Sequence, residues 1–153
     1  MTATSTPHRI RWAQRALQFF GALCAALLFA QAAQADPPGR VGRVADSTGT
    51  VWIFDAEQGE WVNAARNRPV TAGDRLSTER GARLQVQIGS ASLRLDGSTE
   101  VEMQRLDDER VQVHVNAGTV ALRVRSREAA RQFEVSTPQG RFAPVTEGLY
   151  RID

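Results

Sequence analysis

The feature that most constrains the fold is an alternation of apolar and polar residues with a period of two. Segments 84–88, 111–115 and 120–124 each place an apolar side chain at every second position. Because successive side chains of a β-strand point to opposite faces, each segment predicts a strand with one buried and one solvated face. Turn residues separate these short segments, and only residues 127–132 suggest a helix. We therefore expect an all-β domain, either an antiparallel β-sandwich or a compact β-roll or solenoid-like domain.

One turn predicts how two of these strands pair. A two-residue loop of Ala117 and Gly118 would place Val115 opposite Val120 and keep the apolar residues of both strands on one face. We therefore predict a β-hairpin at this loop.

A second turn does not allow the same loop length. A two-residue loop at Asp96 and Gly97 would place Leu93 opposite Glu100, so the apolar faces would not match. We predict either a three-residue loop over 96–98, which pairs Leu93 with Val101, or a solenoid-like corner in place of a hairpin.

The first 35 residues have the three parts of a secretory signal peptide. Arg9, Arg11 and Arg15 precede an apolar run over 19–30, and the segment ends with small residues at Ala33 and Ala35. We expect this signal helix to be cleaved after Ala35, which sends the protein to the periplasm or outside the cell. The alternative is a retained membrane anchor, but the apolar run is shorter than the ~20 residues that span a bilayer.

After this segment we expect a linker over 36–41 and one β domain over 42–153. The chain ends at Asp153 inside an expected strand, so a truncated C-terminus is left open. The only cysteine, Cys24, lies in the expected signal peptide. A lipoprotein site there is the weaker alternative, because Leu23 stands where a small residue is usual. The processed chain would have no cysteine for a disulfide or a thiolate site.

Charge argues against nucleic-acid binding by the processed protein. The whole chain has 19 arginines and 17 acidic residues, and three of the arginines leave with the signal peptide. The remainder has a net charge of −1 and no basic run of the kind that binds phosphate backbones.

Catalytic and metal-binding residue types are sparse. His114 is the one histidine after the signal peptide, and we expect it to be a solvated strand residue. The acidic run Asp107-Asp108-Glu109 suggests a solvated turn more than a Ca²⁺ site, because it lacks the spaced ligands that wrap the ion. We expect no enzyme activity, no metal and no cofactor. A hydrolase with an unusual site is the remote alternative.

Two groups of residues are candidates for binding. Arg123, Arg125 and Arg127 share one face at strand spacing, with Arg110 expected beside them. They form either an interaction face for an acidic partner, a phosphate or a glycan, or simply a solvated surface.

Trp52, Phe54 and Trp61 are the second group. Trp52 and Trp61 would form a glycan platform if they were exposed. We expect these aromatic side chains to be buried in the core instead.

Several short motifs occur together in one order. They are Gly49-Thr50-Val51, Trp61, Pro69-Val70-Thr71-Ala72-Gly73-Asp74-Arg75-Leu76-Ser77-Thr78, Gly81-Ala82-Arg83-Leu84, Leu93-Arg94-Leu95-Asp96-Gly97-Ser98, Ala117-Gly118-Thr119-Val120 and Phe133-Glu134-Val135-Ser136-Thr137-Pro138. This order resembles the FecR-like periplasmic domain over about residues 41–152. From the residues themselves, Gly73 suits a turn with positive φ, and Asp74 can accept backbone N–H bonds within that turn.

The resemblance implies an all-β domain whose best-known members pass an iron-uptake signal through the inner membrane to a sigma factor. Those regulators carry a cytoplasmic segment and a membrane helix before the domain, where this chain has the predicted signal peptide. We therefore expect an exported form without the anti-sigma segment. Its function would be protein interaction, signal sensing or scaffolding with an envelope protein partner, with glycan binding in the cell envelope as the alternative. We expect no membrane span in the processed form.

Overall fold

The computed structural model describes residues 39–153. The predicted signal peptide, its cleavage site and Cys24 lie outside the described residues, as does the first half of the expected linker, residues 36–38. Among the described residues, no helix has both the length and the apolar character needed to cross a membrane.

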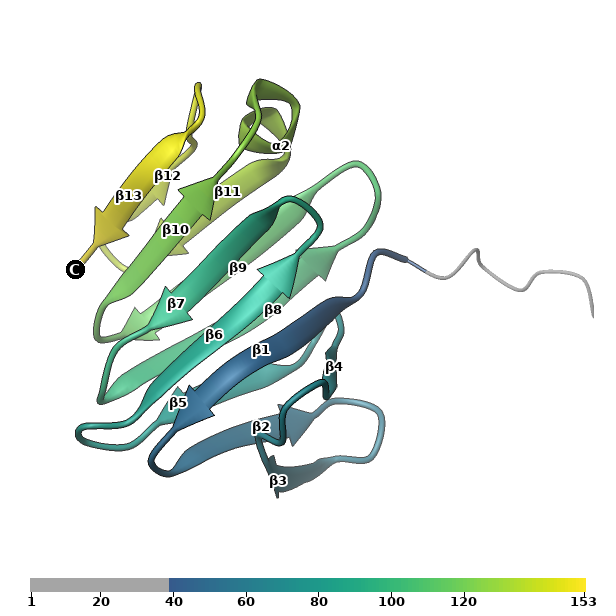
Figure 1. Ribbon diagram of the computed structural model, residues 1–153, viewed down its shortest axis with the longest axis vertical. Helices are drawn as coiled ribbons and strands as arrows, with labels where there is room; N and C mark the ends of the chain where they lie inside the picture. The colour runs from purple at the N-terminus through teal and green to yellow at the C-terminus, as the bar shows by residue number, and fades with distance from the viewer. Residues whose placement is uncertain (1–38) are drawn as a thin grey trace, which may run out of the picture. The chain divides into compact units, whose positions relative to one another are not determined.

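The described residues form two β-sheets, sheet A and sheet B, that face each other. Figure 1 draws sheet A in front of sheet B. Sheet A has six strands in the order β13-β10-β7-β6-β1-β4, and sheet B has seven in the order β12-β11-β9-β8-β5-β2-β3. The strands of sheet A are β1 (Gly42–Thr48), β4 (Pro69–Val70), β6 (Arg83–Ile88), β7 (Ala91–Leu95), β10 (Val120–Val124) and β13 (Gly148–Ile152). The strands of sheet B are β2 (Val51–Asp55), β3 (Glu60–Asn63), β5 (Arg75–Thr78), β8 (Thr99–Leu106), β9 (Val111–Ala117), β11 (Phe133–Thr137) and β12 (Gly140–Phe142).

The core lies between the sheets and consists of the inward residues of the alternating strands. Leu93 and Leu122 of sheet A and Leu76 and Met103 of sheet B are each fully buried. The polar residues between them face outward, as the period of two requires. The prediction of an all-β sandwich is confirmed.

The predicted hairpin at Ala117 and Gly118 is wrong. Strand β9 belongs to sheet B and β10 to sheet A, so Val115 pairs with Val101, and Val120 pairs with Leu95. The chain crosses from one sheet to the other at Gly118. The alternation did not reveal this, because two strands bury the same residues whether they lie side by side or face each other across the core.

The predicted pairing of Leu93 with Val101 is also wrong, because β7 and β8 lie in different sheets. Leu93 pairs with Val86 on one side and Leu122 on the other. The alternative, a solenoid-like corner, describes residues 96–98, where Ser98 has a φ of 57°.

The one described helix, α2 (Arg127–Gln132), lies where the sequence suggested it. Ser126 caps its start, since the hydroxyl oxygen accepts a hydrogen bond from the Ala129 N–H at 3.2 Å. The helix lies on the crossing from β10 in sheet A to β11 in sheet B, and β11 runs parallel to β9. Sheet B is therefore mixed.

The turn before β5 forms as expected. Gly73 has a φ of 89°, a conformation that suits glycine. The Asp74 carboxylate accepts hydrogen bonds from the backbone N–H of Thr71 at 2.8 Å and of Ala56 at 3.0 Å. The second bond ties this turn to the loop after β2.

Candidate functional site

The four arginines predicted to share one face are divided between the two sheets. Arg123 lies on β10 of sheet A. Arg125 is the first residue after that strand, and Arg127 begins α2. Arg110 lies at the β8–β9 turn of sheet B and lines a different hollow with Arg131. The expected neighbourhood of Arg110 and Arg123 is wrong, because it depended on a β9–β10 hairpin that does not form.

The sheet register places other arginines near Arg123 instead. Arg43, Arg83, Arg94 and Arg123 come from four adjacent strands of sheet A, and all four are exposed on its outer surface. We call these four residues the arginine face. Arg123 aligns with Ser92, Gln87 and Arg43 in one row across the strands. The row spans roughly 14 Å, or three strand spacings of about 4.8 Å.

The arginines of the arginine face are not engaged in ion pairs with other described residues. Within residues 39–153, none of its four arginines has a carboxylate oxygen within 4.0 Å. Arg94 is oriented by Gln85, whose Oε1 accepts a hydrogen bond from Nε at 2.9 Å. Asp46 and Asp96 line a hollow of about 360 Å³ with Arg83 and Arg94. The Asp96 carboxylate, however, lies 3.3 Å from Arg151.

Arg125 and Arg127 lie beside this face near β13. Arg123 and Arg125 line a hollow of about 530 Å³ with Glu147 and Leu149. Arg127 Nε is 3.9 Å from the Glu147 carboxylate, and both side chains are largely exposed. An exposed pair of this kind contributes little stability.

The expected burial of the tryptophans in the core is wrong. Trp52 is 37% exposed and Trp61 is 46% exposed, both on the outer surface of sheet B. In β2 the residues buried are Val51 and Ile53, which alternate with Trp52 and Phe54. Because all four residues are apolar, the alternation could not predict which pair faces the core.

The structure brings Trp52 and Trp61 to one hollow of about 300 Å³, with Ser77 as its third lining residue. We call it the aromatic hollow. Trp61 pairs with Phe54 across β3 and β2, and their ring centroids are 5.5 Å apart in an edge-to-face arrangement. Trp52 pairs with Ser77 across β2 and β5. Three neighbouring strands therefore hold the hollow.

Charged residues contact or neighbour the residues that line the aromatic hollow. The Arg75 guanidinium lies over the Phe54 ring, 4.2 Å from its centroid, and 5.5 Å from the Trp61 centroid. The Glu79 carboxylate accepts a hydrogen bond from Trp52 Nε1 at 3.2 Å. Glu100 is the cross-strand neighbour of Ser77 on β8 and accepts a hydrogen bond from Asn116 at 3.3 Å.

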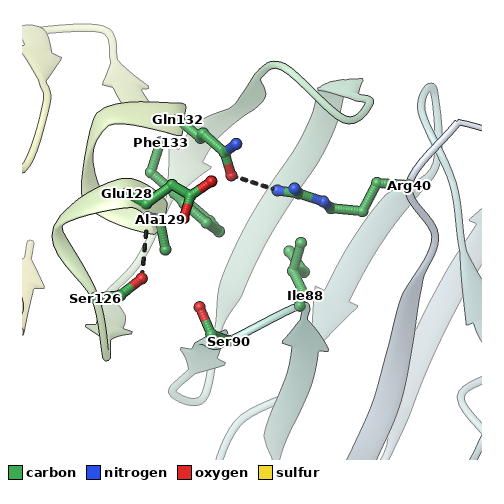
Figure 2. Close-up of a pocket in the computed structure, with 9 residues that line it drawn as sticks. Arg40, Ile88, Ser90, Ser126, Glu128, Ala129, Gln132 and Phe133 are labelled. Atoms are coloured by element: carbon green, nitrogen blue, oxygen red, sulfur yellow. Dashed lines mark hydrogen bonds between the residues drawn. The ribbon is translucent and has the colours of Figure 1, made fainter.

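A further hollow lies between α2 and the segment before β1 (Figure 2). Arg40 crosses it and donates a hydrogen bond from Nη1 to Gln132 Oε1 at 2.8 Å. Ile88, Glu128 and Phe133 are among its other lining residues. Its volume of about 220 Å³ is below the ~300 Å³ typical of ligand pockets. The Arg40–Gln132 bond is a structural connection that holds the start of the domain against α2.

His114 lies on the outer surface of sheet B and is partly buried. Its Nδ1 is 2.8 Å from the Ser136 hydroxyl, its parallel neighbour on β11. In the described part of the chain, no carboxylate forms a hydrogen bond with this histidine to complete a catalytic triad. The absence of enzyme activity stays a prediction.

Asp107 organises the turn between β8 and β9. Its carboxylate accepts hydrogen bonds from the backbone N–H of Arg110 at 2.8 Å and of Glu109 at 2.9 Å, and it pairs with Arg105. These bonds lower the pKa of Asp107 to about 2, with the Arg105 hydrogen bond as the largest cause. The acidic run therefore has the turn role expected of it.

A family model described as FecR protein matches residues 74–146, from the start of the β5 segment to just before β13. Neither a curated protein nor a solved structure matches the chain.

Proposed function

We propose that this FecR-like protein acts in sensing or signalling at the cell envelope, as a non-catalytic, exported interaction module. Its N-terminal segment would direct export, with cleavage after Ala35 and release into the periplasm or outside the cell. Its partner would be an acidic envelope protein. The processed domain would sense or scaffold by binding that partner.

The arginine face is the observation that carries this proposal. Among the described residues these four exposed guanidinium groups form no ion pair, so no salt bridge within the fold accounts for them. A guanidinium binds carboxylates in a two-pronged geometry that lysine cannot match. Ser92 and Gln87 lie between Arg123 and Arg43 in the row; Ser92 is buried and Gln87 is half-buried, so the two arginines are the exposed members of the row.

Site-specific photocrosslinking in living cells tests this face. The full chain is expressed with a benzophenone amino acid at Gln87, which lies between Arg43 and Arg123 in the row. The matched position is Gln112, which is also half-buried but lies on the outer surface of sheet B. We expect one discrete protein adduct from position 87 and none from position 112.

Charge reversal then links the adduct to the arginines. R43E/R123E should abolish the adduct, whereas R66E/R80E makes the same change of charge in exposed turns and should retain it. Equal adducts from both crosslinking positions, or an adduct that survives R43E/R123E, would show that this face is not the binding surface.

Glycan binding at Trp52 and Trp61 is the second candidate function. The observation that favours it is that the two exposed rings line one hollow of about 300 Å³. A W12F background restricts the tryptophan fluorescence of the full chain to these two residues. Fluorescence that stays unchanged across a panel of soluble cell-wall glycans would count against this function.

A further inference from the structure

We propose that the aromatic hollow binds glycans that carry free amino groups, meaning oligosaccharides whose amino sugars are not acetylated. The proposal deepens the second candidate function and depends on it. It names the class of glycan from the charges around Trp52 and Trp61.

The lining of the hollow suits a sugar ring. A pyranose has an apolar face of C–H groups and a rim of hydroxyl groups, so it matches an aromatic surface that has polar groups at its edge. Trp52 and Trp61 supply the aromatic surface, and the lining also includes Ser77. In residues 39–153 the Ser77 side chain has no hydrogen bond that a ligand would have to break. Trp52 and Trp61 are diagonal neighbours across β2 and β3, which places their backbones about 7–8 Å apart.

The tryptophan rings are held in place before any ligand binds. The Glu79 carboxylate fixes the indole N–H of Trp52, and Phe54 contacts Trp61 edge to face. Fixed side chains lose less conformational entropy when a ligand binds, which favours affinity.

The charges at the hollow favour a cationic ligand. Among the described residues, neither Glu79 nor Glu100 has an arginine nitrogen within 4.0 Å. Glu79 is hydrogen-bonded to Trp52, and Glu100 is the cross-strand neighbour of Ser77, so two of the three lining residues have a glutamate next to them. An ammonium group on the sugar would form charge-assisted hydrogen bonds with these carboxylates.

The Arg75 guanidinium beside the hollow is already engaged. The Arg75 guanidinium lies on Phe54 and Trp61, and Arg75 pairs across the strands with Glu102. Its position shows that this ring system accommodates a positive charge. An acidic sugar, in contrast, would meet repulsion from Glu79 and Glu100.

A comparison of two matched oligosaccharides tests the proposal. The full chain with W12F is titrated with the tetrasaccharide of glucosamine and with the tetrasaccharide of N-acetylglucosamine, at low salt and neutral pH. Fluorescence reports binding, and calorimetry gives the dissociation constants. We expect the unacetylated tetrasaccharide to bind at least about tenfold more tightly, since one charge-assisted hydrogen bond supplies that difference.

Variants separate the aromatic from the electrostatic contribution. W61A should weaken both ligands about tenfold or more, as loss of an aromatic contact predicts. E79Q/E100Q should remove the preference for the free amine, while the new amide side chain at position 79 keeps an oxygen that can accept the Trp52 N–H. E134Q, on β11 of the same surface, is the control and should leave both affinities unchanged. Circular dichroism and the urea midpoint verify that each variant is folded.

The outcomes distinguish this proposal from the function on which it rests. Equal binding of the two tetrasaccharides, or tighter binding of the acetylated one, overturns the charge preference but leaves glycan binding in place. Failure of both to bind overturns the two together. A preference that survives E79Q/E100Q shows that these carboxylates do not select the ligand.

Discussion

Thr78 and Thr99 are hydrogen-bonded across adjacent corners of the sandwich, where the Thr78 hydroxyl accepts the backbone N–H of Thr99 at 3.0 Å. The Thr99 hydroxyl does the same for the backbone N–H of Thr119 at 3.0 Å. Both threonine side chains are buried at places where the chain leaves one sheet for the other. Each hydroxyl therefore satisfies a backbone N–H close to a point where the chain passes between the sheets.

Replacing Thr99 with valine should destabilise the domain by about 1–3 kcal/mol, because the Thr119 N–H would lose its acceptor in a partly buried position. Valine keeps the shape of threonine, so the change isolates the hydroxyl. Urea unfolding of the full chain, followed by circular dichroism, measures the effect. Thr48 is exposed, and T48V is the matched control with an expected change near zero. Equal midpoints for the two variants would contradict this role of Thr99.

Gly118 allows the crossing between β9 and β10, and alanine there should destabilise the domain by about 3 kcal/mol or more, from backbone strain and overpacking combined. Its φ is 88°, and a Cβ atom would lie 2.6 Å from the Ser98 carbonyl oxygen. Gly59 has a φ of 71° but no atom within 4 Å of an added Cβ. G59A should therefore cost only about 1–2 kcal/mol. Thermal unfolding compares the variants, and equal costs would show that the close approach at Gly118 is unimportant.

Asp74 connects the turn before β5 to the loop after β2, and D74A should cost about 2–3 kcal/mol, since hydrogen bonds to a charged group are stronger than neutral ones. The side chain is 4% exposed. Its loss leaves the N–H groups of Thr71 and Ala56 without their acceptor. Asp108 is exposed, and D108A serves as the control. Chemical denaturation measures the stability of both variants. A D74A variant as stable as the unmodified protein would show that Asp74 does not stabilise the connection between the two loops.

Asp107 should titrate with a pKa of about 2, below its ordinary value of 3.8, because Arg105 and two backbone N–H groups stabilise the carboxylate. Since the folded pKa is the lower one, the stabilising contribution is complete above about pH 3.8 and is lost as the pH falls towards 2. Carbon NMR of the Asp107 carboxyl group follows the titration. R105Q should move the midpoint towards 3.8. An unchanged midpoint would show that Arg105 is not the main cause.

The binding surfaces could be predicted only in part. The alternation identified Arg123 as an outward residue, but its neighbours Arg43 and Arg94 are distant in the chain and depend on the sheet register. The sequence favoured a buried Trp52 over an exposed aromatic hollow, because β2 carries apolar residues on both faces. A useful sign was present at Ser77, a polar residue whose pairing with Trp52 identifies the outer surface.

The amino-acid pattern alone was enough to predict that the domain is all-β, which residues of most strands face the core, and where a turn suits glycine. These properties are local, since the direction of a side chain follows from its position along a strand and φ follows from its own residue. The pairing of the strands, in contrast, could be known only from the folded chain. Backbone hydrogen bonds accept any strand as a partner, and Val115 and Val120 bury equally well on opposite sides of the core as they would within one sheet. The arginine face and the aromatic hollow depend on that choice of neighbours, so only the folded chain reveals them.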